Sequence, residues 1–164
     1  MDKRSPNEVP PMKRNRRAIV ACSVIAGMFS AAPVFGQAAK QVINAPNARP
    51  GVLSTAVKVG DIIFLSGALG TKPGGGGLAE GGIEGQTRQA LENIKASVTL
   101  AGGTMQDIAK CSVFLADVKD FQAMNGVYRE FFPNDPPART TVGVAGLVVP
   151  GALIEIECTA AAKK

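Results

Sequence analysis

The sequence predicts one α+β domain, in which a mixed β-sheet carries two helices on one face. Three observations support this class. Five segments are rich in β-branched and apolar residues, two others repeat apolar residues at helical spacing, and the order is strand, strand, helix, strand, helix, strand, strand. That order is typical of helices gathered on one side of a sheet.

The first half of the domain begins with a predicted hairpin. Residues 52–59 and 62–67 are its strands, and Gly60-Asp61 is the turn. The glycine-rich connection at 72–77 lacks the Lys-Ser/Thr ending of a phosphate-binding loop, so we expect no phosphate site there. Residues 83–100 form a predicted helix. Its buried face consists of Ile83, Ala90, Leu91, Ile94 and Val98.

The second half contains the other predicted helix, which begins at Asp117 or Asp120 and runs through Phe132. Its apolar stripe is more typical of a protein core than of a cofactor site. The stripe consists of Phe121, Met124, Val127, Tyr128 and Phe131. The predicted strands of this half are 110–116, 139–145 and 153–160.

Two strand segments are apolar on both sides. Residues 62–65 and 113–115 carry apolar side chains at both alternating positions, which indicates that both faces of the sheet are buried. Two helices cover only one face. We therefore expect a homo-oligomer, in which another copy of the chain covers the second face.

The composition excludes several kinds of chemistry. The chain has no histidine, so it contains no imidazole base, no Ser-His or Cys-His pair and no His-rich zinc site. Of its 18 basic and 13 acidic residues, six basic and two acidic ones lie in residues 1–36. The remaining 12 basic and 11 acidic residues make the rest nearly neutral, and we expect no nucleic-acid partner.

The N-terminal region is typical of a secretory signal. The basic cluster at 13–17 precedes an uncharged apolar stretch and small residues, so we interpret 1–36 as a signal peptide that directs the chain to the periplasm or outside the cell. Cleavage would follow Gly36 or Ala38, and Met12 is an alternative start. An uncleaved membrane anchor is the other interpretation, but the stretch is short and Pro33 breaks it. Residues 37–50 are a predicted linker.

Removal of the leader leaves Cys111 and Cys158. An exported protein could join them in a disulfide. Both lie in apolar strand segments, however, where a free buried thiol is a common small core residue. The pattern favours free thiols and leaves the disulfide as the alternative.

Polar residues stand out in the last two strands. Strand alternation places Glu155 and Glu157 on one face, and Ile154, Ile156 and Cys158 on the other. Taken alone, two glutamates indicate a solvated edge strand. Arg139 at the start of the preceding strand, taken alone, is typical of a surface residue.

Seven short motifs change this interpretation. They are Gly60–Gly67, Gln86–Lys95, Leu100–Gly103, Val113–Asp117, Asn125–Phe132, Pro137–Val142 and Ile154–Glu157. In this order and at this spacing, from about residue 44 to residue 161, the chain resembles the RidA (YjgF) family of enamine/imine deaminases. The resemblance implies a RidA-like domain over 51–164 with a chorismate-mutase-like fold, assembled as a homotrimer with sites between subunits.

The resemblance also implies the roles of individual residues. Arg139 matches the arginine that binds the substrate carboxylate, and Glu155 the glutamate that positions water. Three further matches line the pocket: Ser66, Gly67 and Asn125. Two pocket positions differ from the family pattern, because Leu53 stands in place of a tyrosine and Thr141 in place of a cysteine.

The expected reaction is the hydrolytic deamination of reactive 2-enamino and 2-imino acids to 2-keto acids and ammonia. It requires an oriented substrate and a placed water, so no metal or organic cofactor is expected. One alternative is a non-catalytic member that binds a small carboxylate or acts as a chaperone. Another is a deaminase for an aminomuconate-type compound, which needs a larger pocket.

Overall fold

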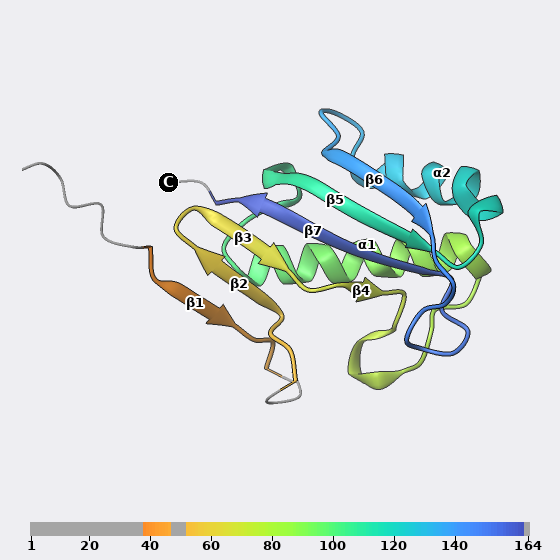
Figure 1. Cartoon of the computed structure of the whole chain (residues 1–164), viewed down its shortest axis with the longest axis horizontal. Helices are drawn as coiled ribbons and strands as arrows, with labels where there is room; N and C mark the ends of the chain where they lie inside the picture. Colours follow the sequence, from red (N-terminus) through yellow and green to blue (C-terminus); the bar gives the residue numbers. More distant parts are fainter. Residues whose placement is uncertain (1–37, 47–51, 163–164) are drawn as a thin grey trace, which may run out of the picture. The chain divides into compact units, whose positions relative to one another are not determined.

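The computed structural model describes residues 38–46 and 52–162. These residues form a seven-stranded sheet and two α-helices (Figure 1). In chain order the elements are β1 (Lys40–Ile43), β2 (Ala56–Val59), β3 (Ile62–Leu65), β4 (Ala68–Leu69), α1 (Gly82–Leu100), β5 (Ile108–Leu115), α2 (Phe121–Phe131), β6 (Ala138–Gly143) and β7 (Ile154–Ala161).

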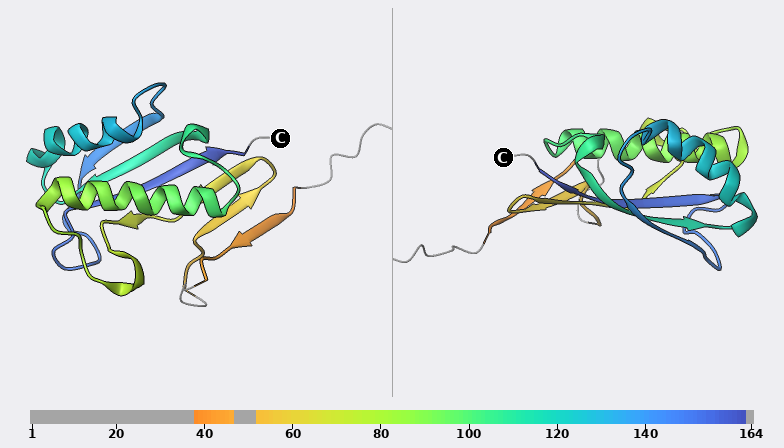
Figure 2. Two further views of the ribbon diagram at one scale, coloured as in Figure 1. Left: turned by 180° about the vertical axis from the view of Figure 1, so that it is seen from behind. Right: turned by 90° about the horizontal axis from the view of Figure 1, so that it is seen from above.

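The strands lie in the order β1-β2-β3-β7-β5-β6, and the short β4 pairs with β7 beyond the end of β3. Neighbouring strands are antiparallel except β5 and β6, which are parallel because α2 crosses over between them. Both helices cover the same face of the sheet (Figure 2). The predicted α+β class, with a mixed sheet and two helices on one face, is therefore confirmed.

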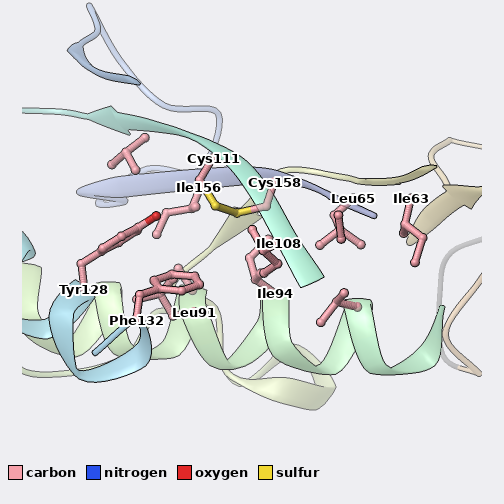
Figure 3. Packing of buried hydrophobic residues seen from close by; sticks show 14 of the residues in the cluster. Ile63, Leu65, Leu91, Ile94, Ile108, Cys111, Tyr128, Phe132, Ile156 and Cys158 are labelled. Carbon is pink, nitrogen blue, oxygen red and sulfur yellow. A yellow bond between two sulfur atoms is a disulfide. The ribbon is translucent and has the colours of Figure 1, made fainter. Parts of the chain in front are cut away.

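The core lies between α1 and the sheet (Figure 3). Leu91, Ile94 and Val98 of α1 are fully buried, as are Ile154 and Ile156 of β7. The helical spacing of the first three and the alternation of the last two bring these side chains together. Full burial of such a side chain contributes roughly 1.5–3 kcal/mol. On the outer surface the guanidinium of Arg88 on α1 donates two hydrogen bonds to the carboxylate of Glu130 on α2, at 2.6 and 2.8 Å.

The other face of the sheet carries no helix. Ile62 and Phe64 point to this face and are each 47% exposed, whereas the intervening Ile63 is fully buried. In the single chain this face is therefore open, whereas the sequence predicts that both faces are buried. The homo-oligomer that would cover the open face remains a prediction.

Three larger differences from the predictions concern the linker, the first hairpin strand and the place of β7 in the sheet. The predicted linker 37–50 contains β1, which pairs with β2 from Lys40↔Val59 to Ile43↔Ala56. The first hairpin strand begins at Ala56 rather than at residue 52. The two glutamates of β7, taken alone, indicated an edge strand. β7 is instead an interior strand, because it lies between β3 and β5.

Cys111 and Cys158 form a disulfide. They are direct neighbours across β5 and β7, and both are buried under the helices. The prediction of free thiols was wrong, because the register that makes the two residues neighbours depends on strands 47 residues apart in the chain.

The predicted signal peptide, the alternative start at Met12 and the cleavage site after Gly36 lie outside the described residues. Within 38–46 and 52–162, no helix is long and apolar enough to cross a membrane.

Candidate functional site

Arg139 on β6 is held by side chains of α2. Its Nη2 donates a hydrogen bond to Oδ1 of Asn125 at 2.6 Å. Its guanidinium carbon lies 4.5 Å from the ring centre of Tyr128 and 5.8 Å from that of Phe121. The first distance is typical of a cation–π contact, which stabilises the charged group by about 0.5–2 kcal/mol. These contacts fix the direction of Arg139 within a pocket of about 300 Å³.

The sequence explains how these residues meet. Asn125 and Tyr128 are three residues apart on α2 and therefore lie on one helix face. Arg139 and Thr141 alternate with exposed neighbours on β6 and share the face that α2 covers, since they pair with buried Cys111 and Val113 of β5. The Oγ1 of Thr141 is buried and has no hydrogen-bond partner among the described residues.

A second group of predicted site residues gathers where β4 meets β7. The carboxylate of Glu155 lies so close to Gly67 that a Cβ at this position would overlap its Oε1. Ser66 Oγ donates to the carbonyl oxygen of Ser54 at 2.6 Å, which ties the segment after Leu53 to the end of β3. Leu53 itself is 64% exposed. The Glu155 carboxylate accepts no hydrogen bond from a described residue, and the residue is partly exposed.

The two groups do not meet within one chain. Glu155 pairs with Phe114 on the open face of the sheet, whereas Arg139 pairs with Cys111 on the helix-covered face. Among the described residues, no hydrogen bond or ion pair joins one group to the other. The structure thus brings Arg139 and Asn125 together, with Thr141 on the same face of β6. It brings Ser66, Gly67 and Glu155 together near the start of β4 and leaves the two sets apart.

Tyr128 was predicted only as a core residue. It is 4% exposed and belongs to the core, but its ring also lies against Arg139. Its position three residues after Asn125 is a signal that could have indicated the second role. Burial raises the pKa of Tyr128 to about 12, although the nearby positive charge of Arg139 acts in the opposite direction.

Two surface residues, Arg88 and Glu130, have shifted pKa values. On the surface, the hydrogen bonds and charge of Arg88 lower the pKa of Glu130, and those of Glu130 raise the pKa of Arg88. The described part of the chain has no cluster of three or more cysteine or carboxylate side chains that could hold a metal ion.

The chain is similar to known proteins in sequence and in fold. The family model described as endoribonuclease L-PSP, which represents the RidA (YjgF) family, matches residues 42–162. The chain belongs to the RidA family. Its similarity to individual RidA members is also high over most of their length. A RutC family protein of Pyrococcus horikoshii is 44% identical over 74% of this chain and 97% of its own.

Two further RidA relatives are informative. The 2-iminobutanoate/2-iminopropanoate deaminase of Dermatophagoides farinae is 41% identical over 72% of this chain and 93% of its own. The crystal structure of RidA from an Antarctic Psychrobacter is 39% identical, covers 74% of this chain and 98% of its own, and superimposes with a TM-score of 0.68.

The comparisons overturn the predicted periplasmic or secreted location. The relative from Pyrococcus horikoshii is archaeal. Another is a mitochondrial protein of Schizosaccharomyces pombe, 43% identical over 68% of this chain and 88% of its own. A third is the chloroplastic Reactive Intermediate Deaminase A of Arabidopsis thaliana, 35% identical over 86% of this chain and 82% of its own. Relatives in these places point away from export, so the predicted signal peptide and periplasmic location are withdrawn.

Proposed function

We propose that the protein hydrolyses reactive 2-imino acids, and the 2-enamino acids that tautomerise to them, to 2-keto acids and ammonia. Water adds to the imine carbon, the carbon–nitrogen bond breaks, and the nitrogen leaves as ammonia. The carboxylate of the substrate takes no part in bond breaking and serves to orient the imine. The names of the mite and Arabidopsis relatives support this reaction class.

The fixed direction of Arg139 carries the proposal. Among the described residues, only one oxygen acceptor, Oδ1 of Asn125, uses a donor of its guanidinium. Nη1 also donates to the weak acceptor Sδ of Met124 at 3.9 Å. The remaining nitrogen–hydrogen groups are available to a carboxylate, which a guanidinium binds through two parallel hydrogen bonds. Each such bond contributes roughly 1.5–3 kcal/mol. Asn125 and Tyr128 keep this group oriented before the substrate arrives.

Glu155 is the proposed group that places the water. Its carboxylate lies beside Gly67, where the absence of a side chain leaves room for the carboxylate. A carboxylate in this position accepts a proton from the attacking water and transfers it toward the departing nitrogen. Ser66 and Leu53 would line the same half of the pocket.

Arg139 and Glu155 act on one substrate only if two copies of the chain supply them. The open sheet face, with Ile62 and Phe64 exposed, is the surface that a second copy would cover. We therefore include in the proposal a homotrimer in which Arg139, Asn125 and Thr141 of one subunit face Glu155 and Gly67 of the next.

The test is an imine-decay assay on the purified protein. An amino-acid oxidase generates 2-iminobutanoate in place, and competition with semicarbazide measures its loss. We expect Arg139→Ala to lower kcat/KM at least about 100-fold, because two charge-assisted bonds are lost. The kcat/KM of Arg139→Lys should lie between those of the wild type and Arg139→Ala. An ammonium keeps the positive charge but cannot bind the carboxylate through two parallel hydrogen bonds.

Lys95→Gln is the matched control. Lys95 is half-exposed on α1 and lies 3.7 Å from Glu92, outside the Arg139 pocket. Wild-type protein that is no faster than Arg139→Ala would reject catalysis. If such a protein still bound 2-oxobutyrate through Arg139, it would be the non-catalytic carboxylate binder instead.

A further inference from the structure

A second arginine lines the pocket of Arg139. The lining consists of Asn125, Tyr128, Arg129, Phe132, Pro136, Pro137 and Arg139. Two of these side chains are cationic and none is acidic. A concave site lined by charges of one sign has a strong electrostatic potential of that sign. The positive potential of this pocket therefore favours an anion with more than one negative charge.

Arg129 reaches the pocket by its place on α2. It follows Asn125 by four residues, so the two lie one helical turn apart on the same face, separated by about 6 Å along the axis. Asn125 in turn holds Arg139 at 2.6 Å. The side chains of Arg129 and Arg139 therefore line the same pocket.

No nearby carboxylate neutralises Arg129. The adjacent Glu130 points elsewhere, because both of its oxygens accept hydrogen bonds from Arg88 of α1. Among the described residues, the Arg129 side chain makes no ion pair or hydrogen bond. Arg129 is also exposed, so its positive charge costs little to maintain until a ligand arrives.

We propose that Arg129 determines specificity by binding the second carboxylate of a dicarboxylic 2-imino acid, while Arg139 binds the carboxylate beside the imine. The inference rests on the proposed function and names a substrate class for that site. A monocarboxylic imine leaves Arg129 without an anion, whereas a dicarboxylic imine satisfies both guanidinium groups through charge-assisted hydrogen bonds. The hydrolysis itself is unchanged.

The experiment compares two imines in the decay assay. An oxidase that accepts glutamate generates 2-iminoglutarate, and the measured quantity is the ratio of its kcat/KM to that of 2-iminobutanoate. We expect Arg129→Gln to lower this ratio about tenfold, the effect of losing roughly one charge-assisted bond. Arg129→Lys, which keeps the charge, should lower it less. Lys95→Gln removes a charge outside the pocket and should leave the ratio at the wild-type value.

The outcomes separate this inference from the proposed function. Turnover of both imines with the same ratio in wild type and Arg129→Gln would overturn the role of Arg129 and leave the deaminase intact. Absence of any imine turnover would reject the deaminase. In that case, binding tests the second carboxylate site. The measured quantity is the ratio of the dissociation constants of 2-oxoglutarate and 2-oxobutyrate, and a ratio that Arg129→Gln leaves unchanged would overturn this site as well.

Discussion

Arg139 and Glu155 belong to the same sheet but point to its opposite faces. Arg139 pairs with the buried Cys111 under α2, and Glu155 pairs with Phe114 on the face that carries no helix. In the proposed mechanism, one chain therefore holds two half-sites, one with Arg139 and one with Glu155. Because the two residues lie on opposite faces, they can act on one substrate only in a site shared between subunits.

Mixed oligomers test this relationship. Arg139→Ala and Glu155→Gln should each be nearly inactive alone, but co-refolding them should restore about a quarter of the wild-type rate, because random assembly pairs an intact Arg139 with an intact Glu155 at that frequency. The imine-decay assay measures the recovery. Mixing Arg139→Ala with Asn125→Ala is the control, since both residues belong to one half-site, and no recovery is expected. Recovery in neither mixture would contradict a shared site.

Gly67→Ala should separate catalysis from binding. The added methyl group overlaps Oε1 of Glu155, whose side chain must move away. We expect kcat to fall by up to about 100-fold, the usual effect of displacing a catalytic group by about 1 Å. KM should change little, because Arg139 is unaffected. Gly146→Ala provides the control, since a Cβ there meets no atom within 4 Å. An unchanged kcat in Gly67→Ala would remove Glu155 from the mechanism.

Thr141 offers a test of the buried hydroxyl in the Arg139 half-site. Its Oγ1 has no partner among the described residues, and a buried unpaired hydroxyl costs about 1–3 kcal/mol. Thr141→Val should therefore preserve or raise the free energy of unfolding, measured in urea. If the hydroxyl binds substrate, the same variant should lose activity. Thr141→Cys, which introduces the residue that the family pattern has here, should keep activity. Equal activity in all three proteins would show that the hydroxyl does not contact substrate.

Tyr128 is the only tyrosine in the chain, so its ionisation can be followed directly by ultraviolet absorbance. Burial raises its pKa from the ordinary 10.0 to about 12. Because the folded value is the higher one, this group contributes its full stability below pH 10 and loses it as the pH rises toward 12. The loss is about 2–3 kcal/mol. Tyr128→Phe should lack this alkaline decline and still support Arg139 with its ring. A tyrosine that ionises near pH 10 in the folded protein would contradict the burial.

The Cys111–Cys158 disulfide predicts a response to reductant. It closes a loop of 47 residues, for which the chain-entropy relation gives up to about 4 kcal/mol of stabilisation. Unfolding in urea with and without reductant measures the difference, and Cys111→Ala/Cys158→Ala should match the reduced protein. Thiol titration of the denatured full chain should find one free cysteine, Cys22, among its three. Three free thiols would contradict the bridge.

The sequence was sufficient for the elements with strong periodicity. The stripe from Ala90 to Val98 predicted α1, and the alternation of Ile154, Glu155 and Ile156 predicted which side chains of β7 share a face. These patterns are local, so each segment reveals them by itself. β1 was missed because four residues with one lysine and one glutamine carry no such pattern, and only pairing with β2 makes them a strand.

The arrangement of the candidate site could not be predicted from the sequence. Motif resemblance selected Arg139, Asn125, Glu155 and Gly67, yet the motifs do not tell whether Arg139 and Glu155 lie on the same face or on opposite faces of the sheet. That relation separates the two half-sites. The disulfide escaped prediction for a similar reason, since strand register is a property of the assembled sheet.

The position of β7 has a consequence for how the protein is made. It is the last strand in the chain, yet it lies inside the sheet and pairs with β3, β4 and β5. During synthesis both helices leave the ribosome before β7, on which α1 packs, has been made. Until then β3, β4 and β5 lack their β7 partner and keep unpaired edges. Closure of the sheet is a late and long-range event, and this favours slow folding with a need for protection from aggregation until residue 161 is free.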